Sequence, residues 1–567
     1  MDSVRKILTP SAVWKDFNGD LPLKDSKINE MSYDGISYAE VYFSGREYNS
    51  SRVRIYGLYA RPNPLPANRK LGAVLIMPDF CDTINLEIVN HFAKMGYAVL
   101  MVDYRGNVGE TTNHTIYPSE IDYANYGKED MFTVERTAKE TCWYEWACVG
   151  KYALSYLKSR IEVDKIALVG IKQGANVGWQ MLYNEERVSC FVSLFGAGWQ
   201  AYKGLFKAEG TDIEMTDERY RWLGGVDAHV YAQYCKCPVL YLTATNSSDF
   251  DCERGFDTIS RLNEAVKRSF NYSPRLSETI NKKSTDDIAL FLKKHLTKAG
   301  SLSDRLYFPN SPAIHLALGD DNCTVFAEVV ADEDDKVRNV AVYVSEGVAD
   351  PSKRNWCQMT AVKNKNSAGR YFKLALGGGT NFVHAFAVVD YKNGVSISSK
   401  IVMKKFEEEI ASSVANMLYS SRSGTDSFTV CDETGNSIGK IFFNENSGVD
   451  LVECANGITG VTSRFGLLSY RIVEKRFNPN ARSIIKTDIY CEDFTRLKIS
   501  VVVAENGTTQ AYSTITDLKG SRVWQRIQID FSNLKNEGRM GIRNYEDIIA
   551  IKIEAESRFA INNLLLI

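Results

Sequence analysis

Apolar and polar residues follow two different rhythms along this chain of 567 residues. In the first half, short apolar runs are separated by segments whose apolar residues recur every three to four positions. The runs are typical of buried strands, and the spaced segments are typical of amphipathic helices. Their alternation predicts a mostly parallel sheet with helices on both faces over residues 1–300. The expected strands are 71–77, 97–102, 166–169, 188–194 and 238–242, and the expected helices are 86–95, 134–158, 175–182 and 285–296.

Beyond a linker at 298–304 the helical spacing disappears, and strand-like runs alternate with turn signals. This change predicts two all-β domains, an immunoglobulin-like or fibronectin-like sandwich over 301–405 and a jelly roll over 406–567. The jelly-roll pattern resembles that of carbohydrate-binding modules. The expected strands are 324–330, 340–344, 371–376 and 383–389 in the sandwich, and 497–503, 524–531, 548–553 and 559–567 in the jelly roll.

One turn in the first half carries the strongest chemical signal. The strand at 166–169 runs into Gly170-Ile171-Lys172-Gln173-Gly174 and then into a helix. This is the layout of a nucleophile elbow, G-x-S-x-G, in which a sharp strand-to-helix turn presents a serine. We expect the two glycines to relieve crowding and to supply positive φ. Lys172 stands where the serine belongs.

The segments around this turn resemble the α/β-hydrolase superfamily, and in particular its acetyl xylan esterase and dienelactone hydrolase branch. The resemblance implies an α/β-hydrolase fold, carbohydrate or ester substrates, and a site with nucleophile, acid and histidine in that chain order. The segments that carry it are Val102-Asp-Tyr-Arg-Gly106, Thr141-Cys-Trp-Tyr-Glu-Trp146, the elbow, and Cys237-Pro-Val-Leu-Tyr-Leu-Thr-Ala-Thr-Asn246.

The catalytic residues that this resemblance implies are incomplete. Asp249 and Asp251 follow the strand at 238–242 and are the candidates for the acid. The histidine is expected within 271–280, but that stretch contains Glu278 instead, and none of the 6 histidines lies in a suitable place. Acyl transfer needs an activated nucleophile, a base and an orienting acid. We therefore expect serine hydrolase chemistry to be lost.

The loop that should supply the oxyanion hole is also altered. It reads Pro78-Asp79-Phe80-Cys81. A proline has no N–H to donate, and a carboxylate is badly placed beside a developing oxyanion. Asp79, Phe80, Cys81 and Gln173 are the candidates for contacts with a ligand in this pocket. Cys81, Cys142 and Cys148 are expected to be small buried hydrophobic residues and not nucleophiles.

Three roles are open to Lys172. The favoured one is an ion pair with Glu278 that fills the volume of the old triad. A second is a clamp for an anionic ligand at the helix N-terminus. A third is catalysis by a lysine whose pKa is depressed by burial and by the helix dipole.

Composition excludes some partners and leaves others open. A net charge of −2 and a pI of about 6.4 give no sign of nucleic-acid binding. No apolar run reaches the roughly 20 residues that span a bilayer, so no membrane partner is expected. Without a recognisable signal peptide, the 12 cysteines are expected to be reduced and the protein cytoplasmic, or secreted if a signal was removed. A homo-oligomer is among the states left open.

The jelly roll offers candidates for sugar and calcium binding. Tyr470, Tyr490 and Tyr512 are the aromatic residues that could present a face to a sugar, whereas Trp356 and Trp524 are interpreted as core. No catalytic metal or cofactor is expected. A structural calcium is an open alternative, with Asp432, Glu433 and Asp530 as candidate ligands.

These observations favour a hydrolase-fold protein with a degenerate active site. The leading hypothesis is a non-catalytic, carbohydrate-associated binding or scaffold protein. The alternatives are a carbohydrate esterase or deacetylase with a non-standard nucleophile or base, and a structural or assembly protein.

Overall fold

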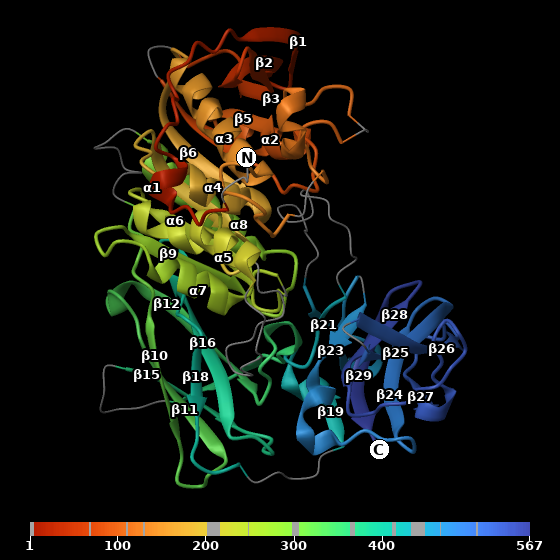
Figure 1. Cartoon of the computed structure of the whole chain (residues 1–567). Helices are drawn as coiled ribbons and strands as arrows, with labels where there is room; N and C mark the ends of the chain where they lie inside the picture. Colours follow the sequence, from red (N-terminus) through yellow and green to blue (C-terminus); the bar gives the residue numbers. More distant parts are fainter. Residues whose placement is uncertain are drawn as a thin grey trace.

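The computed structural model describes residues 5–66, 70–108, 111–128, 131–200, 216–247, 249–297, 306–362, 369–410, 416–431, 448–464, 466–505 and 508–567. One mixed sheet with helices occupies the first half of the chain, and four antiparallel sheets occupy the rest (Figure 1). The two all-β regions lie beside each other beneath the first region. This is the expected order of an α/β-hydrolase fold followed by two all-β domains.

The strand order of the first sheet defines its fold. It runs β1-β2-β3-β5-β4-β6-β7-β8-β9. Every pair from β5 to β9 is parallel, and β1, β2 and β3 are added antiparallel at one edge. Because β5 precedes β4 in this order, β4 lies next to β6. Strand β6, which leads into the elbow, therefore has a hydrogen-bonded neighbour on each side, β4 and β7. The bounds are β1 Ser26–Tyr33, β2 Ile36–Tyr48, β3 Ser51–Pro62, β4 Leu71–Met77, β5 Ala98–Asp103, β6 Val163–Ile171, β7 Val188–Leu194, β8 Val239–Ala244 and β9 Arg268–Ser273.

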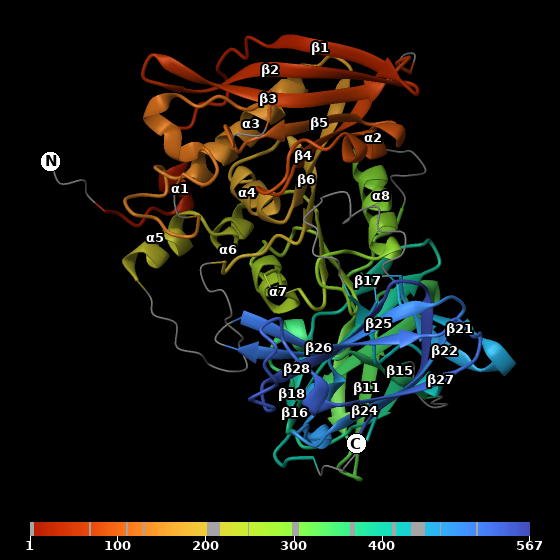
Figure 2. The same cartoon turned by 90° about the vertical axis from the view of Figure 1, so that its right-hand side faces the viewer.

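Helices cover both faces of this sheet, as the sequence pattern predicts. Figure 2 shows α2 and α8 on one side and α3 and α4 on the other. The bounds are α1 Pro10–Val13, α2 Leu86–Lys94, α3 Cys142–Ser159, α4 Gln173–Met181, α5 Asp217–Gly225, α6 Ala228–Tyr231, α7 Cys252–Ser260 and α8 Lys282–Leu296. No helix in these described parts of the chain is both long and apolar enough to cross a bilayer.

Helix α3 starts later than expected. The sequence pattern predicts a helix from about 134, but the helix begins at Cys142 because the Thr141 side chain caps it by accepting a hydrogen bond from Tyr144 N at 3.3 Å. The preceding segment is a loop. Its carbonyl at Val134 accepts a hydrogen bond of 2.6 Å from Arg221 Nε.

The second region is a sandwich of two antiparallel sheets around one apolar core. The third region has the same construction, and residues from both of its sheets meet in its own core. The strands of the second region are β10 Ala313–Leu318, β11 Thr324–Val330, β14 Thr360–Val362 and β15 Arg370–Ala375 in one sheet, and β12 Val337–Glu346, β13 Cys357–Gln358, β16 Phe382–Tyr391, β17 Ser396–Ser398 and β18 Val402–Lys405 in the other. Those of the third are β19 Met417–Ser420, β21 Asp450–Glu453, β22 Thr459–Thr462, β24 Ile484–Cys491, β27 Gln525–Asp530 and β29 Phe559–Leu566, facing β20 Thr429–Val430, β23 Leu467–Ser469, β25 Thr495–Glu505, β26 Thr508–Leu518 and β28 Ile548–Ala555.

The sandwich lies against β9, the last strand of the first sheet. Tyr272 N in β9 donates to Ser398 Oγ at 2.9 Å, and Asn271 Nδ2 donates to Ser396 O at 3.1 Å. Ser396 N in turn donates to the buried carboxylate of Asp287 on α8 at 3.1 Å. Burial raises the pKa of Asp287 well above its ordinary value. Polar groups at the free edge of β9 are therefore satisfied by the neighbouring region.

Candidate functional site

The elbow after β6 keeps the backbone of a nucleophile turn. A Cβ on Gly170 would lie 2.4 Å from Ala175 Cα, and a Cβ on Gly174 would lie 2.0 Å from Pro78 O. The expected crowding is confirmed. The expected positive φ is wrong for the glycines, because Lys172 itself adopts φ of 51°. The central residue therefore carries the strained conformation that such an elbow imposes.

Lys172 and Glu278 form the ion pair that the sequence favours. Lys172 Nζ lies 2.9 Å from Glu278 Oε2, and the two side chains are 14% and 43% exposed. Glu278 comes from the loop between β9 and α8, where the histidine of an esterase is expected. The pair places an ammonium and a carboxylate where the nucleophile and the histidine of an esterase are expected.

The pKa of Lys172 is shifted in the direction opposite to the one that a catalytic lysine needs. Burial pulls its pKa down, but the carboxylates of Glu278 and Asp79 outweigh burial and leave the pKa above its ordinary value. The expectation of a depressed pKa is therefore wrong, because two anions lie beside the ammonium. A lysine held in its charged form is neither a nucleophile nor a base near neutral pH.

The Asp79 carboxylate occupies the position of an oxyanion. Its Oδ1 accepts hydrogen bonds from Phe80 N at 2.9 Å and from Gln173 N at 3.3 Å. These are the two backbone donors of an oxyanion hole in this fold, one after the nucleophile position and one in the loop after the early strand. The donors survive, contrary to the sequence interpretation of this loop, but a built-in anion fills them.

The electrostatics of Asp79 follow from this position. The side chain is 8% exposed, and burial raises its pKa to about 6 against the opposing effects of Lys172 and the two N–H groups. In its ionised form Asp79 also repels any further negative charge. An oxyanion that forms during ester hydrolysis would meet a carboxylate instead of free donors.

The other ligand candidates gather around the same turn. Phe80 stacks on Tyr126 with ring centroids 5.2 Å apart. Gln173 Nε2 donates to Gln200 Oε1 at 3.3 Å. Cys81 is exposed, so its expected burial is wrong, whereas Cys142 and Cys148 are buried as expected.

Cys81 does not replace the missing nucleophile. Burial of the sulfur and the nearby Asp79 charge raise the pKa of its thiol. Its Sγ lies 3.8 Å from Tyr126 Oη. A thiol whose pKa is raised supplies less thiolate at neutral pH than an ordinary cysteine does.

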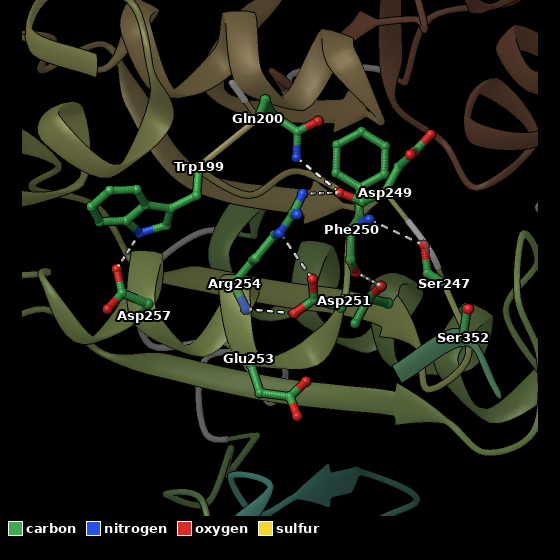
Figure 3. A network of polar contacts seen from close by, with 12 residues as sticks. Trp199, Gln200, Ser247, Asp249, Phe250, Asp251, Glu253, Arg254, Asp257 and Ser352 are labelled. Carbon is green, nitrogen blue, oxygen red and sulfur yellow. Dashed lines mark hydrogen bonds and ion pairs between the residues drawn. The ribbon is translucent and has the colours of Figure 1, made fainter. Parts of the chain in front are cut away.

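The two acid candidates have other roles. Asp251 caps α7 by accepting from Arg254 N at 2.9 Å and pairs with Arg254 Nε at 2.9 Å. Asp249 is exposed, and its side chain points away from that pair (Figure 3). Its backbone carbonyl accepts from Gln200 Nε2 at 2.9 Å. Neither aspartate takes part in the Lys172–Glu278 pair.

The loops after β8 and β9 bind the all-β regions instead. Asn246 Nδ2 donates to Ser352 O at 3.2 Å and to Arg354 O at 2.8 Å. Arg354 Nη1 pairs with Glu253 Oε1 at 2.5 Å. The end of β8, where a triad acid would stand, is thus a docking point for the sandwich.

Arg275 connects all three regions from the loop that also carries Glu278. Its Nε donates to Trp356 O at 2.8 Å, and its guanidinium pairs with Asp426 of the third region. Asp426 Oδ2 also accepts from Gln358 N of the second region at 3.0 Å. Asn246 and Arg275 carry no local sequence signal, since their partners lie far away along the chain.

One of the three candidate tyrosines presents no face to a sugar. Tyr512 is 2% exposed, and its hydroxyl donates to Glu505 at 2.6 Å. Tyr470 lines a small space between the three regions together with Arg275 and Trp356. Trp356 is fully buried, as expected.

Tyr490 is half-buried and packs against Trp524, with ring centroids 5.7 Å apart. The interpretation of Trp524 as core is wrong. Its side chain is half-buried and lies outside the core of the third region as the structure describes it. The ring lies over Gly460, where a Cβ would come within 2.8 Å of Trp524 Cη2.

The metal expectation stays a prediction. Asp432 and Glu433 lie outside the described residues. Within the described residues, no group of three or more histidine, cysteine or acidic side chains is placed to hold a metal ion.

The fold and the elbow together define an α/β-hydrolase-fold protein in which charged side chains of the chain itself stand at the nucleophile and oxyanion positions. No family model and no curated protein matches the sequence. Among solved structures, the chain is similar to acetyl xylan esterase 1 from Thermoanaerobacterium sp. JW/SL YS485, with 17% identity, a TM-score of 0.38, and coverage of 52% of this chain and 94% of that one. An acetyl xylan esterase from Paenibacillus sp. R4 gives 17% identity, a TM-score of 0.39, and coverage of 52% and 98%. A glucuronoyl esterase from Solibacter usitatus gives 10% identity, a TM-score of 0.36, and coverage of 50% and 91%. The fold assignment rests on the strand order itself.

Proposed function

We propose that this chain is a non-catalytic, carbohydrate-associated binding or scaffold protein built on a hydrolase fold. The observation that carries the proposal is the Asp79 carboxylate, which accepts from Phe80 N and Gln173 N. An ester carbonyl that entered the pocket would find both donors occupied. Lys172 and Glu278 replace the nucleophile and the base with a mutual ion pair.

The loss in kcat that follows removal of each catalytic group favours inactivity. Loss of the nucleophile or the base of a triad lowers kcat by about 10⁶. Loss of one oxyanion donor by itself lowers kcat by about 10² to 10³. The raised pKa of Lys172 also argues against the alternative of an esterase with a lysine nucleophile.

The carbohydrate part of the proposal rests on the outer face of the sheet that contains β24, β27 and β29. Trp524 and Tyr490 form an aromatic pair there. Asp488 on the same strand as Tyr490 accepts from Arg526 Nε at 2.9 Å and from Asn563 Nδ2 at 2.6 Å. Trp524 Nε1 is itself buried and has no hydrogen-bond partner among the described residues, so the pair would offer a ring face and not this donor. A half-buried aromatic pair beside polar groups suits a sugar ring, which has an apolar face and a polar edge.

A structural role is the second candidate. Asn246 and Arg275 show that loops used for catalysis in related folds here hold the domains together. An assembly function would need neither the elbow nor the aromatic face. It would appear as concentration-dependent association in light scattering, without turnover and without glycan binding.

The test of inactivity uses p-nitrophenyl acetate and acetylated xylo-oligosaccharides at high enzyme concentration. We expect no turnover from the wild type, and none from Lys172→Ser, because Asp79 still fills the oxyanion hole and no histidine is present. The matched variant adds Asp79→Gly and Glu278→His to Lys172→Ser. Wild-type turnover that Lys172→Ser abolishes would overturn the proposal and make Lys172 catalytic.

A further inference from the structure

A large cleft lies in the first region, away from the elbow. Its volume is about 1110 Å³, slightly above the roughly 300–1,000 Å³ typical of ligand pockets. Neither Lys172 nor Asp79 nor Glu278 is among its described lining residues. The described lining comes from the chain around residues 16–21, the end of β2, the first turns of α3, and the segments 120–128 and 133–141.

Two walls of this cleft are fixed to α3. On one side, Tyr152 Oη donates to Asn18 O at 2.5 Å, and Ser155 Oγ donates to Gly19 O at 3.1 Å. On the other side, Trp146 Nε1 donates to Ala124 O at 2.7 Å. Trp143 Nε1 in the same helix donates to Met131 O at 2.6 Å. Buried side chains therefore hold both walls, and the cleft is formed before any ligand arrives.

The floor combines aromatic rings with one guanidinium group. Arg46 Nε lies 3.0 Å from Glu145 Oε2, and Nη2 pairs with Oε1 of the same carboxylate, which is fully buried. The guanidinium carbon lies 5.3 Å from the centre of the Tyr48 ring and 5.6 Å from that of Tyr144. Arg46 Nη1 has no hydrogen-bond partner in the described structure. The floor therefore offers an oriented donor between two tyrosines.

The charges around the cleft cancel each other. Lys139 Nζ pairs with Asp16 at 2.9 Å, and Arg136 pairs with Glu140 at 3.0 Å. The charge of Arg46 is neutralised by Glu145. Glu120 and Glu135 add negative charge to the described lining and Lys128 adds positive charge, while Glu47 pairs with Arg52 at 3.3 Å. The described lining therefore offers no excess of positive charge that would attract an anionic ligand.

We propose that this cleft is a binding site for a neutral oligosaccharide. Sugars offer apolar ring faces to tyrosines and hydroxyl groups to the paired charged side chains at the rim. Tyr48 and Phe17 provide aromatic surface, and Arg46 provides a fixed donor. The choice of a glycan as ligand rests on the proposed function, whereas the cleft itself does not. The site is separate from the Tyr490–Trp524 pair and lies in a different region of the chain.

Isothermal titration with xylotetraose, cellotetraose, mannotetraose and chitotetraose tests the site. We expect Tyr48→Ala to weaken binding at the cleft about two- to tenfold, because it removes an aromatic contact with the ligand. Thr133→Trp should weaken or remove binding there by obstructing part of the cleft with a bulky side chain, while every polar group of the floor stays in place. Tyr33→Ala removes a tyrosine that is 75% exposed on β1 and should change nothing. Thermal melting of each variant checks that it is folded.

Trp524→Ala separates this site from the proposed jelly-roll surface. Binding that Thr133→Trp removes and Trp524→Ala leaves intact supports the cleft and contradicts the aromatic face. The reverse result overturns the cleft and leaves the proposed function standing. Two binding sites, each lost in one variant, support both. A folded wild type that binds none of the four sugars overturns both, and preference for a glucuronate-containing oligosaccharide overturns the assignment to a neutral ligand.

Discussion

The elbow after β6 and the loops after β8 and β9 are constrained in different ways. The elbow has the backbone of a nucleophile turn, with Lys172 at φ of 51° in the central position. The loops after β8 and β9 hold the two all-β regions through Asn246 and Arg275. The elbow is constrained by close packing around its two glycines, whichever side chain stands at position 172. The loops are constrained by what they bind.

The largest expected effect tests whether close packing constrains the elbow. Gly174→Ala places a Cβ 2.0 Å from Pro78 O and 2.3 Å from Met77 O, and neither backbone oxygen can move cheaply. We expect a loss of about 4 kcal/mol in the free energy of unfolding, measured by urea denaturation. Gly538→Ala is the control, because its nearest neighbour would lie 3.4 Å away, and it should change stability by less than about 0.5 kcal/mol. Equal stability of the two variants would show that the elbow is not constrained by packing.

The next effect tests whether Arg275 stabilises the contact between the first region and the two all-β regions. Arg275→Ala removes the bond to Trp356 O and the pair with Asp426, and leaves a partly buried carboxylate without its cation. We expect a loss of about 2–3 kcal/mol in the same measurement. Arg275→Gly should lose about 1 kcal/mol less, because residue 275 has φ of 64°, which glycine adopts without strain.

Arg496→Ala is the matched control for Arg275, since its pair with Asp517 is more than 60% exposed on both sides. Its loss should stay below about 1 kcal/mol. The docking role of Arg275 is contradicted if the two arginine variants are equally stable.

The smallest effect concerns the charge inside the elbow pocket. The pKa of Asp79 is about 6 in the folded protein and about 3.9 in an unfolded chain. The folded state therefore keeps a proton that the unfolded state has released, and this group makes stability fall as pH rises from about 4 to 6. Asp79→Asn removes that dependence and should be more stable than the wild type by about 1–3 kcal/mol above pH 6, with the difference closing near pH 4.

Urea unfolding at a series of pH values measures this difference. Asp249→Asn is the control, because the Asp249 side chain is exposed and lies outside the Lys172–Glu278 pair. A difference between wild type and Asp79→Asn that stays constant from about pH 4 to 7 would show that Asp79 is not a buried charge in the folded state.

Local patterns predicted most of the fold. Strands β4 and β7 were predicted to the residue, because an apolar run with polar flanks marks a fully buried strand. The start of α3 was missed, because the apolar residues between 134 and 141 mimic a helix that the Thr141 cap ends. Trp524 was misassigned for a similar reason, since an apolar residue beside a strand can cover the outer face as well as the core.

The site was predicted in part. Chain order placed Glu278 opposite Lys172, and the ion pair followed from their charges. The position of Asp79 did not follow, because it depends on the path of the turn that brings Phe80 N and Gln173 N to one point. Asn246 and Arg275 were missed for a more basic reason. Their partners are more than 80 residues away in sequence, and no short-range pattern reports such contacts.

Ser398 at the edge of β9 has a consequence for how this protein is divided. An uncovered edge strand leaves backbone N–H and C=O groups unpaired, and these groups can pair with a strand of another protein chain. Here Ser398 Oγ accepts from Tyr272 N, so the sandwich takes the place of a neighbouring strand. The boundary that the sequence predicts near residue 300 therefore separates β9 from the residues that cover its edge.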